Sequence, residues 1–319
     1  MSASPGTIDL QVNGYAGVDF NQPDPDALTA EQLHHACQAM AGDAVAGALA
    51  TVISDDLTLM QRRLRRLATL READPLARQL IVGLHVEGPF LNEQDGYRGA
   101  HPLEAMQPAS EDAMQRLLDA GDGLVRLVTL APERDPGMKV IRRLAKQGVR
   151  VSAGHCDPSL DVLDAAIDAG LSLFTHLGNG CPMSMHRHDN VIQRALARAD
   201  RLWLCFIADG VHVPFPALGN YLRLAGDRAV VVTDAMAAAG LGPGLHRLGQ
   251  WEIEVGDDLA AWAPDRSHLV GSAMTMPQAT KNLAARLRLP PDRVRQLTRD
   301  NPGRALGMQP ETRRATTAR

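Results

Sequence analysis

The sequence lacks the features of a secreted, membrane-spanning or disulfide-bonded protein. Its four cysteines stand singly, with no C-x-x-C pair, which predicts free thiols in a reducing compartment. No apolar run approaches the ~20 residues that a membrane-spanning helix needs. No charged and then apolar leader precedes Thr7. We therefore expect a cytoplasmic protein with no membrane partner.

The sequence also lacks an excess of basic residues. Its formal charge is -4 over 319 residues, whereas nucleic-acid-binding domains usually carry clustered positive charge. The densest basic run, 62–66, follows a helical period and indicates a solvated helix face. Internal repeats, low-complexity tracts and domain linkers are likewise missing. These absences argue against a nucleic-acid partner and against several domains.

Short apolar runs alternate with helical patterns along the chain, which predicts a (β/α)8 TIM barrel of the α/β class. With 45% hydrophobic residues, the chain can bury one large core. We expect one barrel over residues 1–308 and a polar C-terminal tail over 309–319. The expected strands are 7–12, 46–53, 79–87, 125–130, 149–153, 171–175, 202–208 and 229–233, and two closing helices are expected over 276–287 and 292–306.

Several of the expected strands end in a polar residue, and a barrel gathers its strand ends on one rim. The run 81–87 ends in Glu87, and later runs end at His155 and His176. Two imidazoles and one carboxylate form an open zinc set with a fourth position for water. A lone strand-end histidine is more often structural, but two histidines and a glutamate placed together on neighbouring strands favour a metal site.

The last strand ends at Asp234, where a general acid/base is needed. Such a group takes a proton from the attacking water and returns it to the leaving amine. As an isolated residue, Asp234 would be better interpreted as a helix N-cap or turn residue. Asp209 competes for the catalytic role, although it could serve only to shape the turn that presents His212.

Two long connections carry the remaining candidates. The turn Gly178-Asn179-Gly180 offers backbone N–H groups to an anion such as phosphate. Arg187 could clamp the same anion, or its His-rich loop could be plain polar surface. His101 ends the loop 88–109 and is a candidate electrophile for a substrate oxygen. Beyond the last strand, 250–255 and 259–263 predict a small hairpin over the barrel mouth.

The ordered motifs resemble those of the N-acetylglucosamine-6-phosphate deacetylase family of the amidohydrolase superfamily. The resemblance covers residues 8–307 and is carried by His85-Val86-Glu87-Gly88-Pro89-Phe90, Arg98-Gly99-Ala100-His101, Gly154-His155, Thr175-His176-Leu177-Gly178-Asn179-Gly180, Ala208-Asp209-Gly210-Val211-His212 and Thr233-Asp234-Ala235. It implies metal-dependent hydrolysis of N-acetylglucosamine 6-phosphate to glucosamine 6-phosphate and acetate. It also implies a homodimer in which an arginine can reach the neighbouring site.

The resemblance assigns roles to residues of this chain. Glu87, His155 and His176 would bind the metal, and Asp234 would be the catalytic acid/base. The sugar phosphate would be held by His101, Asn179, Gly180, Arg187 and His212.

Three features depart from the family pattern. Gln11 and Asn13 stand where two-metal amidohydrolases have H-x-H, which predicts a single divalent ion, with zinc favoured over iron or another first-row metal. We expect the family's small β-sandwich to be absent, and the phosphate turn has an altered sequence. A deacylase of another small N-acyl compound and a non-catalytic sugar-phosphate-binding barrel therefore stay open as alternatives. The presence of Asp234 speaks against the second of these, because a pure binder needs no proton shuttle.

Overall fold

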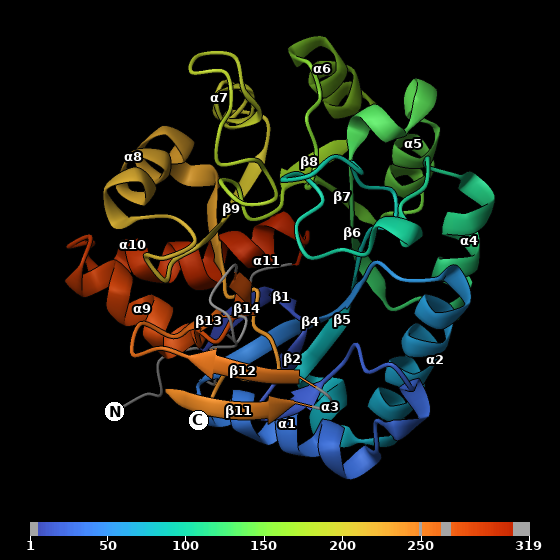
Figure 1. Ribbon diagram of the computed structural model, residues 1–319, viewed down its shortest axis with the longest axis vertical. Helices are drawn as coiled ribbons and strands as arrows, with labels where there is room; N and C mark the ends of the chain where they lie inside the picture. The colour runs from blue at the N-terminus through green and yellow to red at the C-terminus, as the bar shows by residue number, and fades with distance from the viewer. Residues whose placement is uncertain (1–5, 249–250, 263–268, 309–319) are drawn as a thin grey trace, which may run out of the picture.

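The barrel predicted from the sequence is confirmed. The computed structural model describes residues 6–248, 251–262 and 269–308, and its main sheet is a nearly closed ring of parallel strands (Figure 1). The strands follow one another in chain order around the ring: β1 (Thr7–Val12), β4 (Val45–Ile53), β5 (Ile81–Glu87), β6 (Val125–Leu130), β7 (Arg150–Ala153), β8 (Leu171–Phe174), β9 (Trp203–Ile207) and β10 (Ala229–Val232).

Helices surround this ring, and most begin where a side chain caps the first turn. Thr29, Asp56, Ser110, Ser159 and Asn190 each accept a hydrogen bond from a backbone N–H of the helix that follows. The helices are α1 (Ala30–Gly42), α2 (Leu57–Ala73), α3 (Pro75–Leu80), α4 (Glu111–Ala120), α5 (Lys139–Lys146), α6 (Leu160–Ala169), α7 (Val191–Leu196) and α8 (Phe215–Ala225). Among the described helices, none has the length and apolar character that a membrane span requires.

The segment after β10 differs from the expected hairpin. Instead of two strands, the described residues form a four-stranded antiparallel sheet: β11 (Gly244–Leu248), β12 (Trp251–Val255), β13 (Ala260–Trp262) and β14 (Leu269–Ser272). The outer strands were missed because β11 follows a Gly-rich stretch and β14 is only four residues long. Buried side chains of Ile253, Val255 and Ala261 form a small apolar cluster of their own. Residues 250 and 263 of the expected hairpin lie outside the described residues.

Two further differences concern the ends of the chain. The closing helices are α9 (Met276–Ala285) and a second segment that joins α10 (Pro291–Arg295), a π-helical turn (Gln296–Asp300) and α11 (Asn301–Ala305). The two short strands β2 (Gly14–Tyr15) and β3 (Val18–Asp19) pair with each other directly after β1. The expected tail, 309–319, lies outside the described residues, so the domain boundaries stay a prediction.

The barrel interior explains why the strand sequences are short and apolar. All four residues of β10 are buried, as are the last four of β1, because these strands face the interior on one side and helices on the other. Polar residues appear where the strands reach the mouth. This arrangement places the candidate site at the carboxyl ends of the strands, as in other barrels of this type.

Candidate active site

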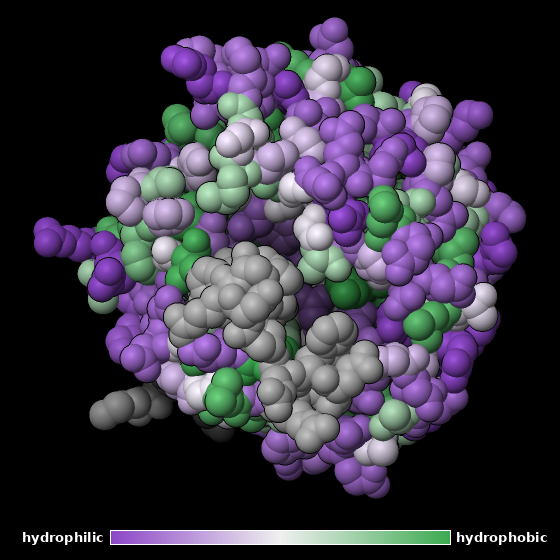
Figure 2. Space-filling view, in the orientation of Figure 1, coloured by the Kyte–Doolittle hydropathy of each residue, from purple (hydrophilic) through white to green (hydrophobic). Residues whose placement is uncertain are grey.

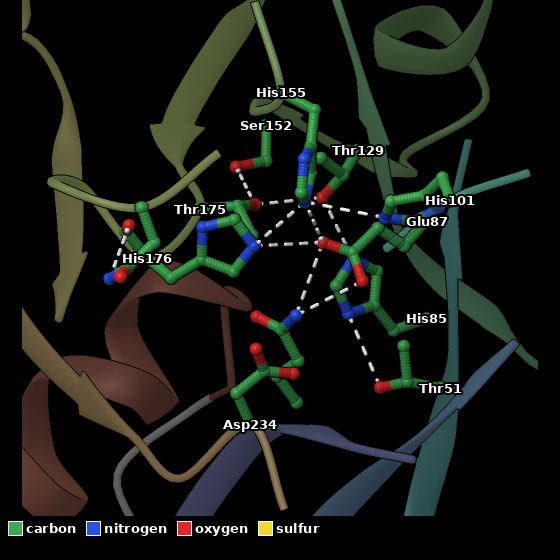
Figure 3. A network of polar contacts seen from close by, with 12 residues as sticks. Thr51, His85, Glu87, His101, Thr129, Ser152, His155, Thr175, His176 and Asp234 are labelled. Carbon is green, nitrogen blue, oxygen red and sulfur yellow. Dashed lines mark hydrogen bonds and ion pairs between the residues drawn. The ribbon is translucent and has the colours of Figure 1, made fainter. Parts of the chain in front are cut away.

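The mouth of the barrel holds the predicted metal ligands side by side. On this face, Figure 2 shows a central hollow with hydrophilic residues at its base. Glu87, His155 and His176 are all buried, and one ligand atom from each lies within 4.8 Å of the others. Figure 3 shows their side chains pointing toward one another from β5 and from the ends of β7 and β8.

The donor atoms of these three residues suit a divalent ion. Nε2 of His176 lies 3.1 Å from Oε1 of Glu87 and 3.1 Å from Nε2 of His155. Nδ1 of His155 donates to the backbone carbonyl of Tyr97 over 2.8 Å, so Nε2 is the nitrogen left to face the cluster. A hydrogen bond at the other nitrogen is the usual way in which a metal-binding imidazole is oriented.

Gln11 holds the carboxylate of Glu87, a contact that was not predicted from the sequence. Its amide nitrogen donates to both carboxylate oxygens, over 3.2 Å and 3.1 Å. Burial acts to raise the pKa of Glu87, but the neighbouring imidazoles of His155 and His176 outweigh it and keep this pKa well below its ordinary value. Glu87 is therefore an ionised, fixed oxygen donor.

Asp234 lies beside this cluster and is held by Asn13. The amide of Asn13 donates to Oδ1 of Asp234 over 2.7 Å. Burial raises the pKa of Asp234, and the nearby carboxylate of Glu87 acts in the same direction. A raised pKa suits a group that must both accept and return a proton near neutral pH. Gln11 and Asn13 are thus engaged as hydrogen-bond donors at the positions where two-metal enzymes carry ligands.

The backbone at this rim adopts a conformation that is rare outside glycine. His155, His176 and Asp234 have φ values of 50°, 29° and 52°, all in the left-handed region. Residues held in this region cost free energy and cluster at functional sites. The three turns aim side chains from different strands at the same point.

His101 reaches the same point from the loop between β5 and α4. Its Nε2 lies 3.3 Å from Nε2 of His155, and its Nδ1 lies 2.9 Å from the Ser54 hydroxyl. Burial lowers the pKa of His101 to about 3, and the neighbouring His155 acts in the same direction. The imidazole is therefore neutral at physiological pH.

A layer of polar side chains lies beneath the cluster (Figure 3). His85 is linked to the Thr129 hydroxyl over 2.8 Å, and that hydroxyl is linked to Thr175 over 2.7 Å. Thr175 continues to Ser152 over 2.6 Å. Burial lowers the pKa of His85 to about 4, so this layer is uncharged and supports the ligand strands from below.

The candidates for phosphate binding are only partly assembled. Asn179 donates to the carbonyl of His176 and closes the turn after β8. Gly180 passes so close to His155 that a Cβ there would lie 2.8 Å from Nδ1, with φ at +61°, so a side chain would push against the imidazole.

Asp209 accepts from the backbone N–H groups of Val211 and His212 and lies 2.5 Å from Nδ1 of His212. This contact fits the interpretation of Asp209 as the residue that shapes the turn presenting His212.

Arg187 is not brought to the cluster. Its side chain is exposed, and no ion pair or hydrogen bond joins it to another described residue. The flanking His186 instead accepts hydrogen bonds from the backbone of residues 188 and 189. Within one chain, the geometry therefore gives Arg187 no role at the site.

Comparisons with known proteins agree with the motif resemblance. No family model matches the chain. The chain is 35% identical over 281 residues to N-acetylglucosamine-6-phosphate deacetylase of Bos taurus, which covers 86% of this chain and 66% of the relative. It is 31% identical over 304 residues to N-acetylgalactosamine-6-phosphate deacetylase of Escherichia coli O157:H7, covering 95% of this chain and 78% of the relative.

A solved structure extends the likeness to three dimensions. An N-acetyl-D-glucosamine-6-phosphate deacetylase mutant from Mycobacterium smegmatis, in complex with N-acetyl-D-glucosamine-6-phosphate, superposes with a TM-score of 0.83 at 32% identity. The match covers 95% of this chain and 77% of that chain. The barrel with its Glu, His and His cluster thus defines an enzyme of the amidohydrolase class. Within that class, the chain belongs to the N-acetylglucosamine-6-phosphate deacetylase family.

Proposed function

We propose that this chain hydrolyses the acetamide of N-acetylglucosamine 6-phosphate and releases glucosamine 6-phosphate and acetate. The observation that carries the proposal is the convergence of Glu87, His155 and His176 beside Asp234 in a chain of this family. The chain spans 66% and 78% of two curated relatives. We place the reaction in the cytoplasm, because all four cysteines are free thiols.

We propose that Glu87, His155 and His176 hold one divalent ion, with zinc favoured over iron or another first-row metal. Such an ion supplies a Lewis acid for the substrate carbonyl and lowers the pKa of water at the site. A second ion would need ligands from β1. Gln11 and Asn13 stand there instead, and their amide nitrogens already donate to Glu87 and Asp234.

Asp234 is the proposed acid/base. Its carboxylate accepts a proton from the attacking water and returns it to the nitrogen of the departing amine. Asn13 orients this carboxylate by its hydrogen bond to Oδ1. Nδ1 of His101 lies 2.9 Å from the Ser54 hydroxyl, and we propose the tautomer that carries its N–H at Nε2, which faces the site. This N–H would stabilise the substrate oxygen as charge develops on it.

The phosphate of the substrate would be bound by the turn Asn179-Gly180, by His212 and by Arg187. Because Arg187 is exposed within its own chain, we propose that it completes the site of a partner in a homodimer. A guanidinium binds phosphate through two parallel hydrogen bonds, which adds affinity without touching the acetamide.

We predict that Arg187→Ala raises KM by about 10-fold or more with little change in kcat, because a charge-assisted phosphate contact is lost while the reacting groups stay intact. Arg142→Ala, which removes another exposed arginine, from α5, is the control. At substrate well below the parent KM, where Arg187→Ala alone is nearly inactive, mixing it with Asp234→Asn should restore about a quarter of the parent activity, since half of the exchanged dimers are mixed and each contains one complete site. Dilution to monomer should raise the parent's KM. A stable monomer with unchanged KM, or a mixture with no recovery, would assign Arg187 to its own chain or to no site.

One assay over a panel of substrates tests the proposed function. The panel holds N-acetylglucosamine 6-phosphate, the same sugar without phosphate, and N-acetylgalactosamine 6-phosphate. The last is the second candidate, because the chain matches a deacetylase of that name over 95% of its length. We expect the highest kcat/KM on N-acetylglucosamine 6-phosphate. Equal turnover of the sugar lacking phosphate would refute the phosphate site.

A further inference from the structure

The barrel has a seam between its first and last strands. β1 and β10 lie at the two ends of the strand order, and no backbone ladder joins them within their described residues. Backbone bonding resumes only at the mouth, where the N–H of Asn13 donates to the carbonyl of Ala235 over 2.7 Å. Unpaired strand edges need other partners. One is Asn301 of α11, whose amide donates to the carbonyl of Ala229 over 2.6 Å.

Asp9 bridges the mouth end of this seam with its side chain. Its side chain is only 2% exposed. One carboxylate oxygen accepts from the backbone N–H of Thr233 over 3.2 Å and from that of Gln11 over 3.3 Å. The other accepts from the Thr233 hydroxyl over 2.5 Å. One carboxylate thus links β1 to Thr233, the residue that follows β10.

The Thr233 hydroxyl connects Asp9 to the backbone on the far side of Asp234. Besides donating to Asp9, it accepts from the backbone N–H of Ala235 over 3.1 Å. The two residues on either side of Asp234 are therefore tied together, and both are tied to β1. Asp234 itself has a φ of 52°, a conformation that persists only where surrounding contacts impose it.

Asp9 and Gln11 alternate along β1, Asn13 directly follows its last residue, and the contacts of all three reach the same site. Gln11 contacts Glu87, Asn13 contacts Asp234, and Asp9 contacts the residue just before Asp234. We infer that Asp9 is a positioning residue for Asp234: through Thr233, it fixes the strained turn that aims the catalytic carboxylate at the substrate. The inference rests on the acid/base role proposed above for Asp234.

A purely structural role is the competing explanation, and the chain offers a matched control. Asp135 is also 2% exposed. Its carboxylate accepts from the backbone N–H groups of Lys139, Val140 and Ile141 at the start of α5. Asp135→Asn therefore removes an equally buried, equally bonded carboxylate from the outer ring of helices.

The test compares Asp9→Asn, Thr233→Val and Thr233→Ser with this control. Asp9→Asn turns an NH₂ group toward the Thr233 hydroxyl, and Thr233→Val removes that hydroxyl at nearly constant volume. We expect each to lower kcat by about 10- to 100-fold with KM and metal content unchanged, because small displacements of a reacting group carry costs of this size. Thr233→Ser should recover most of the rate. The double variant Asp9→Asn/Thr233→Val should have a kcat only slightly below that of either single variant, because both substitutions interrupt the same contacts from Asp9 through Thr233 to Asp234. Asp135→Asn should lower Tm but not kcat.

Parent-like kcat in folded Thr233→Val, or an equal loss in Asp135→Asn, would overturn the inference. If Asp9→Asn does not fold, the Thr233 pair decides alone. A crystal structure of Thr233→Val gives a readout that does not depend on the substrate: we expect Asp234 to have left its hydrogen bond with Asn13, and an unmoved Asp234 refutes the inference. Failure of the parent to release acetate would instead count against the proposed function.

Discussion

Asp234→Asn is expected to lower kcat by about 10² to 10⁴-fold, the usual contribution of a general acid/base. An amide can neither accept the proton of the attacking water nor return it to the amine. The fold and the bound metal should be unaffected, because the side chain keeps its size and Asp234 is not one of the three clustered ligands. Steady-state rates, together with metal content and thermal unfolding of the same preparation, measure all three.

Asp209→Asn is the informative companion to Asp234→Asn. The Asp209 carboxylate is occupied by His212 and two backbone N–H groups, so its loss should disturb the position of His212 and raise KM more than it lowers kcat. If kcat of Asp234→Asn lies within about threefold of the parent value and Asp209→Asn loses most of its kcat, the acid/base role belongs to Asp209.

Glu87→Gln should abolish metal binding and, with it, activity. The change replaces the charged oxygen donor of the cluster by a neutral amide, and its NH₂ group would meet the amide of Gln11, which donates to both oxygens of Glu87 in the parent. A metal at about 1,000 times its Kd stabilises a fold by roughly 4 kcal/mol. The parent should therefore unfold at a lower temperature after chelation, whereas Glu87→Gln should show no response to chelator or added metal.

Elemental analysis measures the number of metal ions bound per chain. Active parent protein purified without chelator should hold one divalent ion per chain. His85→Gln is a suitable control, because His85 also lies on β5 and is buried, but it bonds to Thr129 rather than facing the ligands. Two ions per chain, or none in active protein, would contradict the single-metal site.

The strand pattern was predictable because most barrel strands are short apolar runs that stop at a polar residue or a glycine. The structure places all eight strands within two residues of the expected bounds. Helix α4 was missed although Ser110 caps it and acidic residues fill its first turn, because it follows the long irregular loop 88–109. The four-stranded sheet was underestimated since its outer strands carry weak local signals.

The active site, too, could be predicted from the sequence only in part. Glu87, His155, His176 and Asp234 could be found because each lies at the end of a strand or two residues beyond it, and parallel strands share a rim. The partners that orient them could not, because the contact of Gln11 with Glu87 joins residues 76 positions apart and that of Asn13 with Asp234 joins residues 221 apart. Such pairs depend on strand register and on how the barrel closes. The alternation of Asp9 and Gln11 on β1, with Asn13 just beyond it, was the available signal, since it puts polar side chains at every second position of an otherwise apolar run.

The central claim is that a metal held by Glu87, His155 and His176, with Asp234 as acid/base, hydrolyses the acetamide of a sugar phosphate. Product analysis of the metal-loaded parent with N-acetylglucosamine 6-phosphate tests it most directly. We predict acetate and glucosamine 6-phosphate in equal amounts over many turnovers, with none formed by Glu87→Gln under the same conditions. An inert parent that holds its metal and binds the sugar phosphate would contradict the claim and favour the non-catalytic barrel.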